Sequence, residues 1–123
     1  QSFQQQLFLN QRRMQMNVKD LENVEGITCL YLADEEQTLS DLYCGDLLSD
    51  VMANAAEGSG LCTIQAHKNT IAVASLLGLS AIILCNNRTA TNDMLEAAKS
   101  EGISIFTSKA NHYKTALAIT PRL

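Results

Sequence analysis

Several motifs of known chemistry are missing from this sequence of 123 residues. Its four cysteines form no Cys-x-x-Cys pair, which excludes the common zinc and dithiol motifs. It contains neither G-x-x-x-x-G-K-[ST] nor G-x-G-x-x-G, the loops that bind nucleotide phosphates. It also lacks a run of about 18 apolar residues and a basic leader followed by an apolar stretch. We therefore expect a soluble cytoplasmic protein with no membrane partner, no metal and no cofactor.

A basic surface stripe is also absent, since the net charge is −4 and the pI is near 5.0. This charge argues against nucleic acid as a partner, because a protein that binds nucleic acid needs a basic surface to neutralise the phosphates. The charge is uneven along the chain. Residues 1–57 carry 10 acids and 3 bases, and residues 58–123 carry 3 acids and 6 bases. Two interpretations remain open: the halves complement each other inside one domain, or the second half binds an anion.

Composition and length indicate one folded domain, with 46% hydrophobic and 18% charged residues. The first residues are rich in Gln and lack acids. We interpret residues 1–16 as a tag remnant or upstream extension and residues 17–120 as the domain. The cysteines at 29, 44, 62 and 85 lie in apolar runs, so we predict buried free thiols.

Apolar runs and helical segments alternate along the chain. After a short helix at 17–24 with Asn17 as its cap, a β run follows Gly26, and the acidic stretch 34–41 reads as an exposed connection. Later strands are continuously apolar and the helices between them are short, which is typical of parallel strands covered by helices. The pattern therefore predicts an α/β fold with a mostly parallel sheet flanked by helices. The expected strands are 27–33, 42–45, 61–65, 80–85 and 103–108, and the expected helices are 47–56, 69–78, 91–102 and 110–119.

The strand-to-helix junctions of such a sheet share one rim, where ligands usually bind. The first junction carries Asp46, Ser49 and Asp50. Asp46 is most simply the N-cap of the helix, and Asp50 complements the helix dipole. The two carboxylates could instead support acid–base chemistry or hold a divalent ion. Ser49 has no neighbouring base in the sequence and is a poor nucleophile candidate.

The second junction reads "QAHKNT" and contains His67, Lys68 and Asn69. Asn69 can cap the helix, while the other two place positive groups at a helix start that already favours anions. A structural hydrogen bond for His67 is the alternative. Arg88 lies at the third junction, after the expected strand 80–85, and could pair with an anion or with Asp46 or Asp50. Lys109 and His112 lie at the fourth junction, after the expected strand 103–108, and are weaker candidates.

Two blocks of sequence carry a resemblance to a known family. "DLLSDVM" at 46–52 and "AHKNTIAVA" at 66–74 resemble the D-L-L-S-D-V-M and T-H-x-N-x-x-A-[VI]-A blocks of small stand-alone DRTGG domains, with Ala66 in place of Thr. "EGISIF" at 101–106 is similar to the last strand of that family, so the likeness spans about 17–119. The family's naming signature would fall between Glu36 and Ser40, where only Thr38 matches.

The resemblance implies a fold like the N-terminal domain of HPr kinase/phosphorylase. Family members serve as accessory domains in phosphotransacetylases and nucleotide-sensing pyrophosphatases, so it implies a regulatory, non-catalytic module. We predict a homodimer that binds a small anionic ligand or a protein partner. The predicted ligand-binding residues are Asp46, Ser49, Asp50, His67, Lys68, Asn69 and Arg88. The alternative is a purely structural interaction or dimerisation domain, and a hydrolase-like enzyme is the least favoured interpretation.

Overall fold

The computed structural model describes residues 2, 5 and 15–123. At its centre is a five-stranded sheet with the strand order β2-β7-β6-β5-β4. β2 pairs antiparallel with β7, and the other neighbours pair in parallel. The predicted α/β fold with a mostly parallel sheet is confirmed. The strands are β2 (Ile27–Tyr31), β4 (Asp41–Cys44), β5 (Ser59–Thr63), β6 (Ala81–Leu84) and β7 (Ser104–Ser108).

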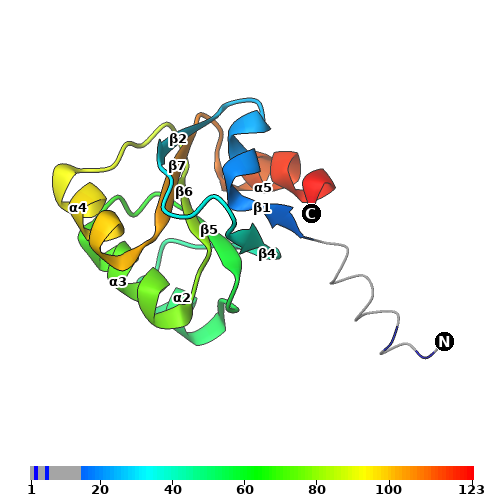
Figure 1. Ribbon diagram of the computed structural model, residues 1–123, viewed down its shortest axis with the longest axis horizontal. Helices are drawn as coiled ribbons and strands as arrows, with labels where there is room; N and C mark the ends of the chain where they lie inside the picture. The colour runs from blue at the N-terminus through cyan, green and yellow to red at the C-terminus, as the bar shows by residue number, and fades with distance from the viewer. Residues whose placement is uncertain (1, 3–4, 6–14) are drawn as a thin grey trace.

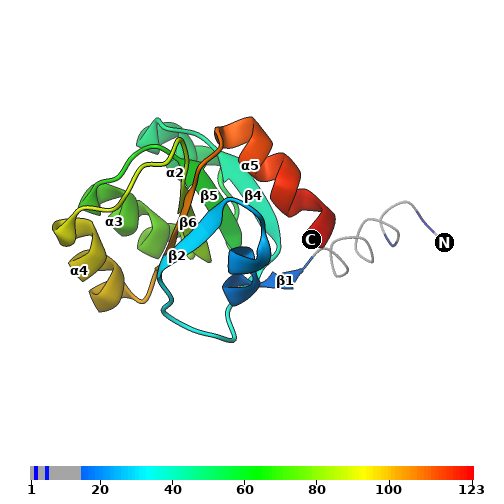
Figure 2. The same cartoon turned by 90° about the horizontal axis from the view of Figure 1, so that it is seen from above.

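Helices cover both faces of the sheet, as the two perpendicular views show (Figures 1 and 2). The three helices that connect the parallel strands lie together on one face, as crossovers of one hand require. The last helix and the short 3-10 helix η1 lie on the other face. The elements are η1 (Val18–Asn23), α2 (Leu48–Asn54), α3 (Lys68–Leu77), α4 (Asn92–Glu101), α5 (His112–Ile119) and η2 (Thr120–Arg122).

The hydrophobic core has two layers, one on each face of the sheet. In β6, Ile82 and Leu84 pack toward α2, α3 and α4, whereas Ile83 packs toward η1 and α5. All four residues of β6 are fully buried. Two covered faces explain why this strand is continuously apolar instead of alternating.

Two segments differ from the sequence prediction. The stretch expected as an exposed connection contains β3 (Thr38–Leu39), which pairs antiparallel with β1 (Met16–Asn17), and Leu39 is fully buried. The first helix is a 3-10 helix, and the Asn17 side chain does not cap it. The interpretation of residues 1–16 as a tag remnant or extension falls mostly outside the described residues.

β5 begins two residues earlier than predicted, at Ser59. Ser and Gly favour strands weakly, but here Ser59 and Gly60 pair with β4 on one side and are buried. A Cβ on Gly60 would lie 2.9 Å from a Leu39 methyl group. Close packing of β3 against β5 therefore requires glycine at this position.

Candidate functional site

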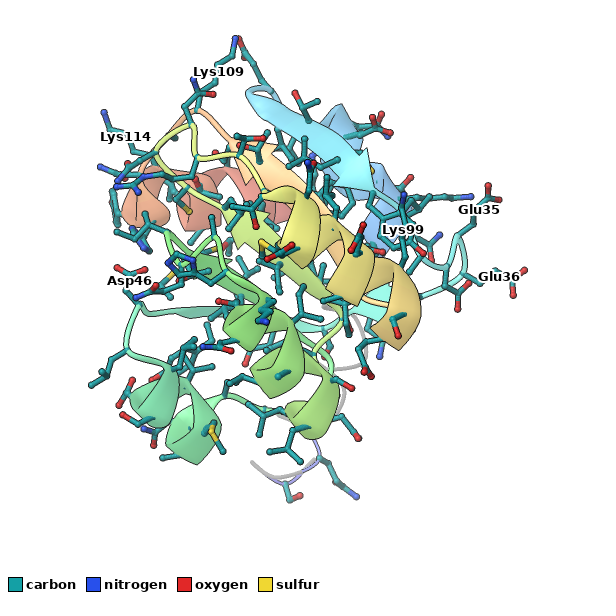
Figure 3. The ribbon with its side chains drawn as sticks, turned by 90° about the vertical axis from the view of Figure 1, so that its left-hand side faces the viewer. Glu35, Glu36, Asp46, Lys99, Lys109 and Lys114 are labelled. Carbon is teal, nitrogen blue, oxygen red and sulfur yellow. The ribbon has the colours of Figure 1, made fainter. Side chains whose placement is uncertain are left out.

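The carboxyl ends of β4, β5, β6 and β7 form one rim of the molecule. Figure 3 shows Asp46, Lys109 and Lys114 on the same side, with Glu35 and Glu36 at the opposite end. Asp46 follows β4, Lys109 follows β7, and Lys114 lies in the first turn of α5. The predicted gathering of strand-to-helix junctions at one rim is therefore present.

Asp46 is the most connected polar side chain at this rim. Its Oδ1 accepts hydrogen bonds from Thr63 Oγ1 at 2.9 Å and from the Ile64 backbone N–H at 2.8 Å. The same oxygen lies 2.9 Å from His112 Nε2. Its backbone carbonyl accepts from Gln65 Nε2 at 2.9 Å. Asp46 thus ties the end of β4 to the end of β5 and to the start of α5.

The prediction that Asp46 caps α2 is wrong. The N-cap of α2 is Leu47, and no side chain caps this helix. The carboxylate has better partners elsewhere, because the chain turns at Gly45 and directs Asp46 across the rim to β5. The Gly45 N–H donates to the Cys62 carbonyl at 3.1 Å, which extends the pairing of β4 with β5 up to this turn.

The contact with His112 depends on how α5 begins. Asn111 caps this helix, since its side chain accepts from the Lys114 N–H at 2.9 Å. A hydroxyl contact of 2.8 Å between Ser108 and Thr115 holds α5 against the end of β7. These bonds fix His112 as the first residue of α5, within reach of Asp46.

Both groups of the Asp46–His112 pair have shifted pKa values. Burial alone would raise the pKa of Asp46, but bonds from Ile64, His112 and Thr63 outweigh it and hold the pKa below 3.8. Burial alone would lower the pKa of His112, but the bond and charge of Asp46 raise it above 6.5. The His112 and Asp46 side chains are 25% and 40% exposed, so solvent screens the pair.

Asp50 and Ser49 do not join this network. Asp50 accepts a hydrogen bond from the Tyr43 hydroxyl and another from the Asn54 amide at 3.0 Å. The bond to Asp50, followed by burial, raises the pKa of Tyr43. Ser49 is exposed, and its side chain makes no hydrogen bond within the described residues. Asp50 therefore acts locally, between β4 and the start of α2.

The second junction presents His67, Lys68 and Asn69 to solvent. His67 is the N-cap residue of α3, with extended backbone angles but no side-chain cap bond. Lys68 and Asn69 are exposed and lie inside the helix, so the prediction that Asn69 caps it is wrong. Thr70 instead anchors the loop, donating from Oγ1 to the Gln65 carbonyl at 2.8 Å.

Arg88 reaches the rim but pairs with neither Asp46 nor Asp50. Over residues 2, 5 and 15–123, the ion pair found is Asp46–His112. The Arg88 side chain is exposed, and its backbone carbonyl accepts from Thr107 Oγ1 at 2.6 Å. The suggested internal salt bridge of Arg88 is therefore not formed.

The structure also adds residues that the sequence prediction ranked low or omitted. His112 was only a weak candidate, Thr63 was not predicted, and Gln65 was placed at the second junction but not among the predicted ligand-binding residues. A signal for Thr63 and Gln65 exists in retrospect, because Thr63 is a polar residue at the carboxyl end of a buried strand and Gln65 lies two residues beyond it. The contact of His112 with Asp46 spans 66 residues and leaves no local signal.

The cysteines depart in part from the prediction of buried thiols. All four are free, and Cys62 and Cys85 are fully buried. Cys29 is half-buried and Cys44 is exposed. Cys44 lies on the edge strand β4, which has a neighbouring strand on one side only.

Metal-binding clusters and membrane-spanning helices are both absent from the described part of the chain. No three His, Cys, Asp or Glu side chains there are arranged to hold a metal ion. The helices of that part are all too short or too polar to cross a membrane.

Comparisons with known proteins give a likeness in fold. No family model and no curated protein matches the sequence. Among solved structures, the chain is similar to the CBS and DRTGG domains of the regulatory region of Clostridium perfringens pyrophosphatase, in complex with the activator diadenosine tetraphosphate. The TM-score is 0.74 with 14% sequence identity, over 87% of this chain and 47% of the other. The chain thus shares a fold with about half of that regulatory region.

Proposed function

We propose that residues 17–120 form a cytoplasmic regulatory module of the DRTGG type, related in fold to the N-terminal domain of HPr kinase/phosphorylase. The module is non-catalytic and binds a small anionic ligand, a nucleotide or a phosphorylated metabolite, at the carboxyl rim of the sheet. The pyrophosphatase region of similar fold is complexed with a dinucleotide joined by phosphates, which supports this class of ligand.

The observation that carries the proposal is the gathering of cations at the rim. Four of the six bases in residues 58–123 lie at rim junctions, all of them exposed. None of them forms an ion pair within the described residues. Unpaired cations favour an anion, and Lys68 also lies at the start of α3, where no side chain caps the helix. The four are Lys68, Arg88, Lys109 and Lys114.

The predicted site residues take different parts in this proposal. His67, Lys68, Asn69 and Arg88 would contact the anionic groups. Asp46 and Asp50 would repel phosphate, so together with Ser49 they would contact ligand hydroxyl or amino groups instead. One carboxylate oxygen of Asp46, Oδ2, makes no hydrogen bond in the described structure and is free for such a contact.

Calorimetric titration of the full chain with diadenosine tetraphosphate, ATP and inorganic phosphate at constant ionic strength tests this function. We expect at least one nucleotide to bind, and Lys109→Ala to weaken its affinity at least threefold. Lys99→Ala is the matched control, because Lys99 lies on α4 away from Asp46, Lys109 and Lys114 (Figure 3). Equal weakening by both variants, or no binding by any of the three ligands, contradicts the proposal.

A second candidate function is a protein-interaction or homodimerisation domain without a small ligand. Tyr113 and Leu117 are 71% and 57% exposed, and their spacing puts them on the same face of α5. Light scattering over a range of concentrations tests it. The control is Leu76→Ser, because Leu76 on α3 is as exposed as Tyr113. The proposal is supported if dimers dissociate in Tyr113→Ser but persist in Leu76→Ser. A strict monomer argues against homodimerisation.

A further inference from the structure

Three cysteines end three neighbouring strands beneath α5. Cys44 is the last residue of β4, Cys62 lies near the end of β5, and Cys85 directly follows β6. Cys62 and Cys85 belong to the core layer on the α5 face. Cys44 faces the same helix, since its Sγ lies 3.9 Å from the His112 carbonyl oxygen. One exposed thiol thus lies next to two buried ones.

The backbone pairing selects which thiols can be joined. Cys44 and Cys62 are direct partners in the parallel ladder of β4 and β5. Paired residues on neighbouring strands lie about 4.8 Å apart with side chains on the same face. That spacing is within the range of about 4.4–6.8 Å between Cα atoms that a disulfide can bridge. The partner of Cys62 on β6 is Ile83, so Cys85 is offset by two residues, about 6.6 Å along the strand.

We propose that Cys44 and Cys62 form a reversible oxidation site, in which a peroxide oxidises Cys44 and Cys62 then closes a disulfide with it. The Cys44 thiolate attacks one peroxide oxygen, so an S–O bond forms and the O–O bond breaks. The departing hydroxide takes up the proton that Cys44 released on ionisation, which gives the first water. The Cys62 sulfur attacks the resulting sulfenic acid, so the S–S bond forms, the S–O bond breaks and the Cys62 proton leaves with the second water. Two thiols lose two electrons and two protons, and one hydrogen peroxide becomes two waters.

The environments of the two thiols suit these separate roles. A hydrogen bond from Cys62, aided by the charge of His112, lowers the pKa of Cys44 to about 7, against the opposing effect of burial. An exposed thiol with such a pKa has a large thiolate fraction at neutral pH and reacts readily. The pKa of Cys62 is raised by its bonds to Cys44 and Cys85 and by burial, so it stays protonated until it attacks.

Peptide mapping can identify the bond after the full chain is treated with hydrogen peroxide. Free thiols are alkylated in denaturant, and the protein is cut with trypsin and a protease specific for Glu. These cuts place Cys29, Cys44, Cys62 and Cys85 in separate peptides, 26–35, 37–57, 58–68 and 69–88. We expect 37–57 linked to 58–68, the link lost on reduction with dithiothreitol, and the other two cysteines alkylated.

Matched serine variants and a non-reducing gel complete the test. Cys44 is exposed, so we expect Cys44→Ser to keep the fold, which circular dichroism checks. This variant should abolish the link, whereas the control Cys29→Ser should keep it. Three results overturn the proposal: a link between 58–68 and 69–88, Cys44 oxidised to sulfinic acid while Cys62 remains free, or disulfide-linked dimers in place of monomers on the gel.

Discussion

The first two strand-to-helix junctions use their polar side chains in opposite ways. At the first junction, Asp46 is bonded to β5 and to the start of α5. At the second, His67 and Lys68 are exposed at the start of a helix that no side chain caps. One junction holds the rim together, and the other leaves charge and backbone N–H groups open to solvent.

This difference separates structural from binding roles at the rim. A carboxylate whose bonds are already made to protein groups stabilises the fold, and its loss leaves those groups without partners. Exposed groups without partners contribute little to stability and are available to a ligand. The comparison therefore predicts large changes in stability at the first junction and changes in ligand affinity at the second.

The largest effect is expected from Asp46→Ala. This change removes the acceptor of the buried Thr63 hydroxyl and the Ile64 N–H, so we expect a loss of about 2 kcal/mol in the free energy of unfolding. Urea titration followed by circular dichroism measures it.

Asp50→Ala is the matched control for Asp46→Ala. Its partners, Tyr43 and Asn54, form exposed hydrogen bonds and can turn to water, so the urea midpoint should move much less. If both variants lose the same stability, the distinction between a connecting and a local carboxylate is wrong.

A smaller effect of opposite sign is expected from His67→Asp. His67 already has the extended backbone of an N-cap, so an Asp side chain there can accept from the free Asn69 N–H. We expect about 1 kcal/mol of added stability, together with weaker anion binding, because the new charge repels a phosphate.

His67→Asn separates the two consequences of that change. It supplies a cap without a charge, so it should add similar stability and leave anion affinity closer to that of the wild type. The measurements are urea titration and calorimetry with the nucleotide that binds best. Unchanged affinity in His67→Asp would place the ligand away from the second junction.

Sequence periodicity was sufficient for the sheet and its helices, for a physical reason. Strands buried on two faces must be continuously apolar, as β6 is, and left-handed glycines such as Gly78 end helices at visible positions. β3 left no pattern, because two residues that pair with a distant segment are too few to show a period. Leu39 is fully buried in the core layer on the η1 and α5 face, although it lies within an acidic stretch.

The candidate site was harder to predict than the fold. Sequence placed Asp46 at a helix start, where a cap is the simplest role, because local spacing says nothing about a neighbouring strand. Its partner His112 comes from a helix that crosses to the other face of the sheet after β7. Only the three-dimensional path of α5 brings the two residues together.

The smallest expected effect is a pH dependence of the Asp46–His112 pair. The pKa of His112 is raised above 6.5 by folding, so its stabilisation is complete below 6.5 and is lost as pH rises through the raised value. The pKa of Asp46 is lowered below 3.8, so its stabilisation is present above 3.8 and is lost as pH falls through the lowered value. The pair therefore stabilises the fold most between these limits. His112→Gln should lower the free energy of unfolding by about 0.5 kcal/mol near pH 5.5 and by less at pH 8.5, since solvent screens both groups.

NMR titration of the His112 imidazole provides the sharper measurement: its pKa should fall in Asp46→Asn and stay unchanged in Asp50→Asn. A His112 pKa that is the same in both variants would mean that the first junction holds α5 through packing and not through this ion pair.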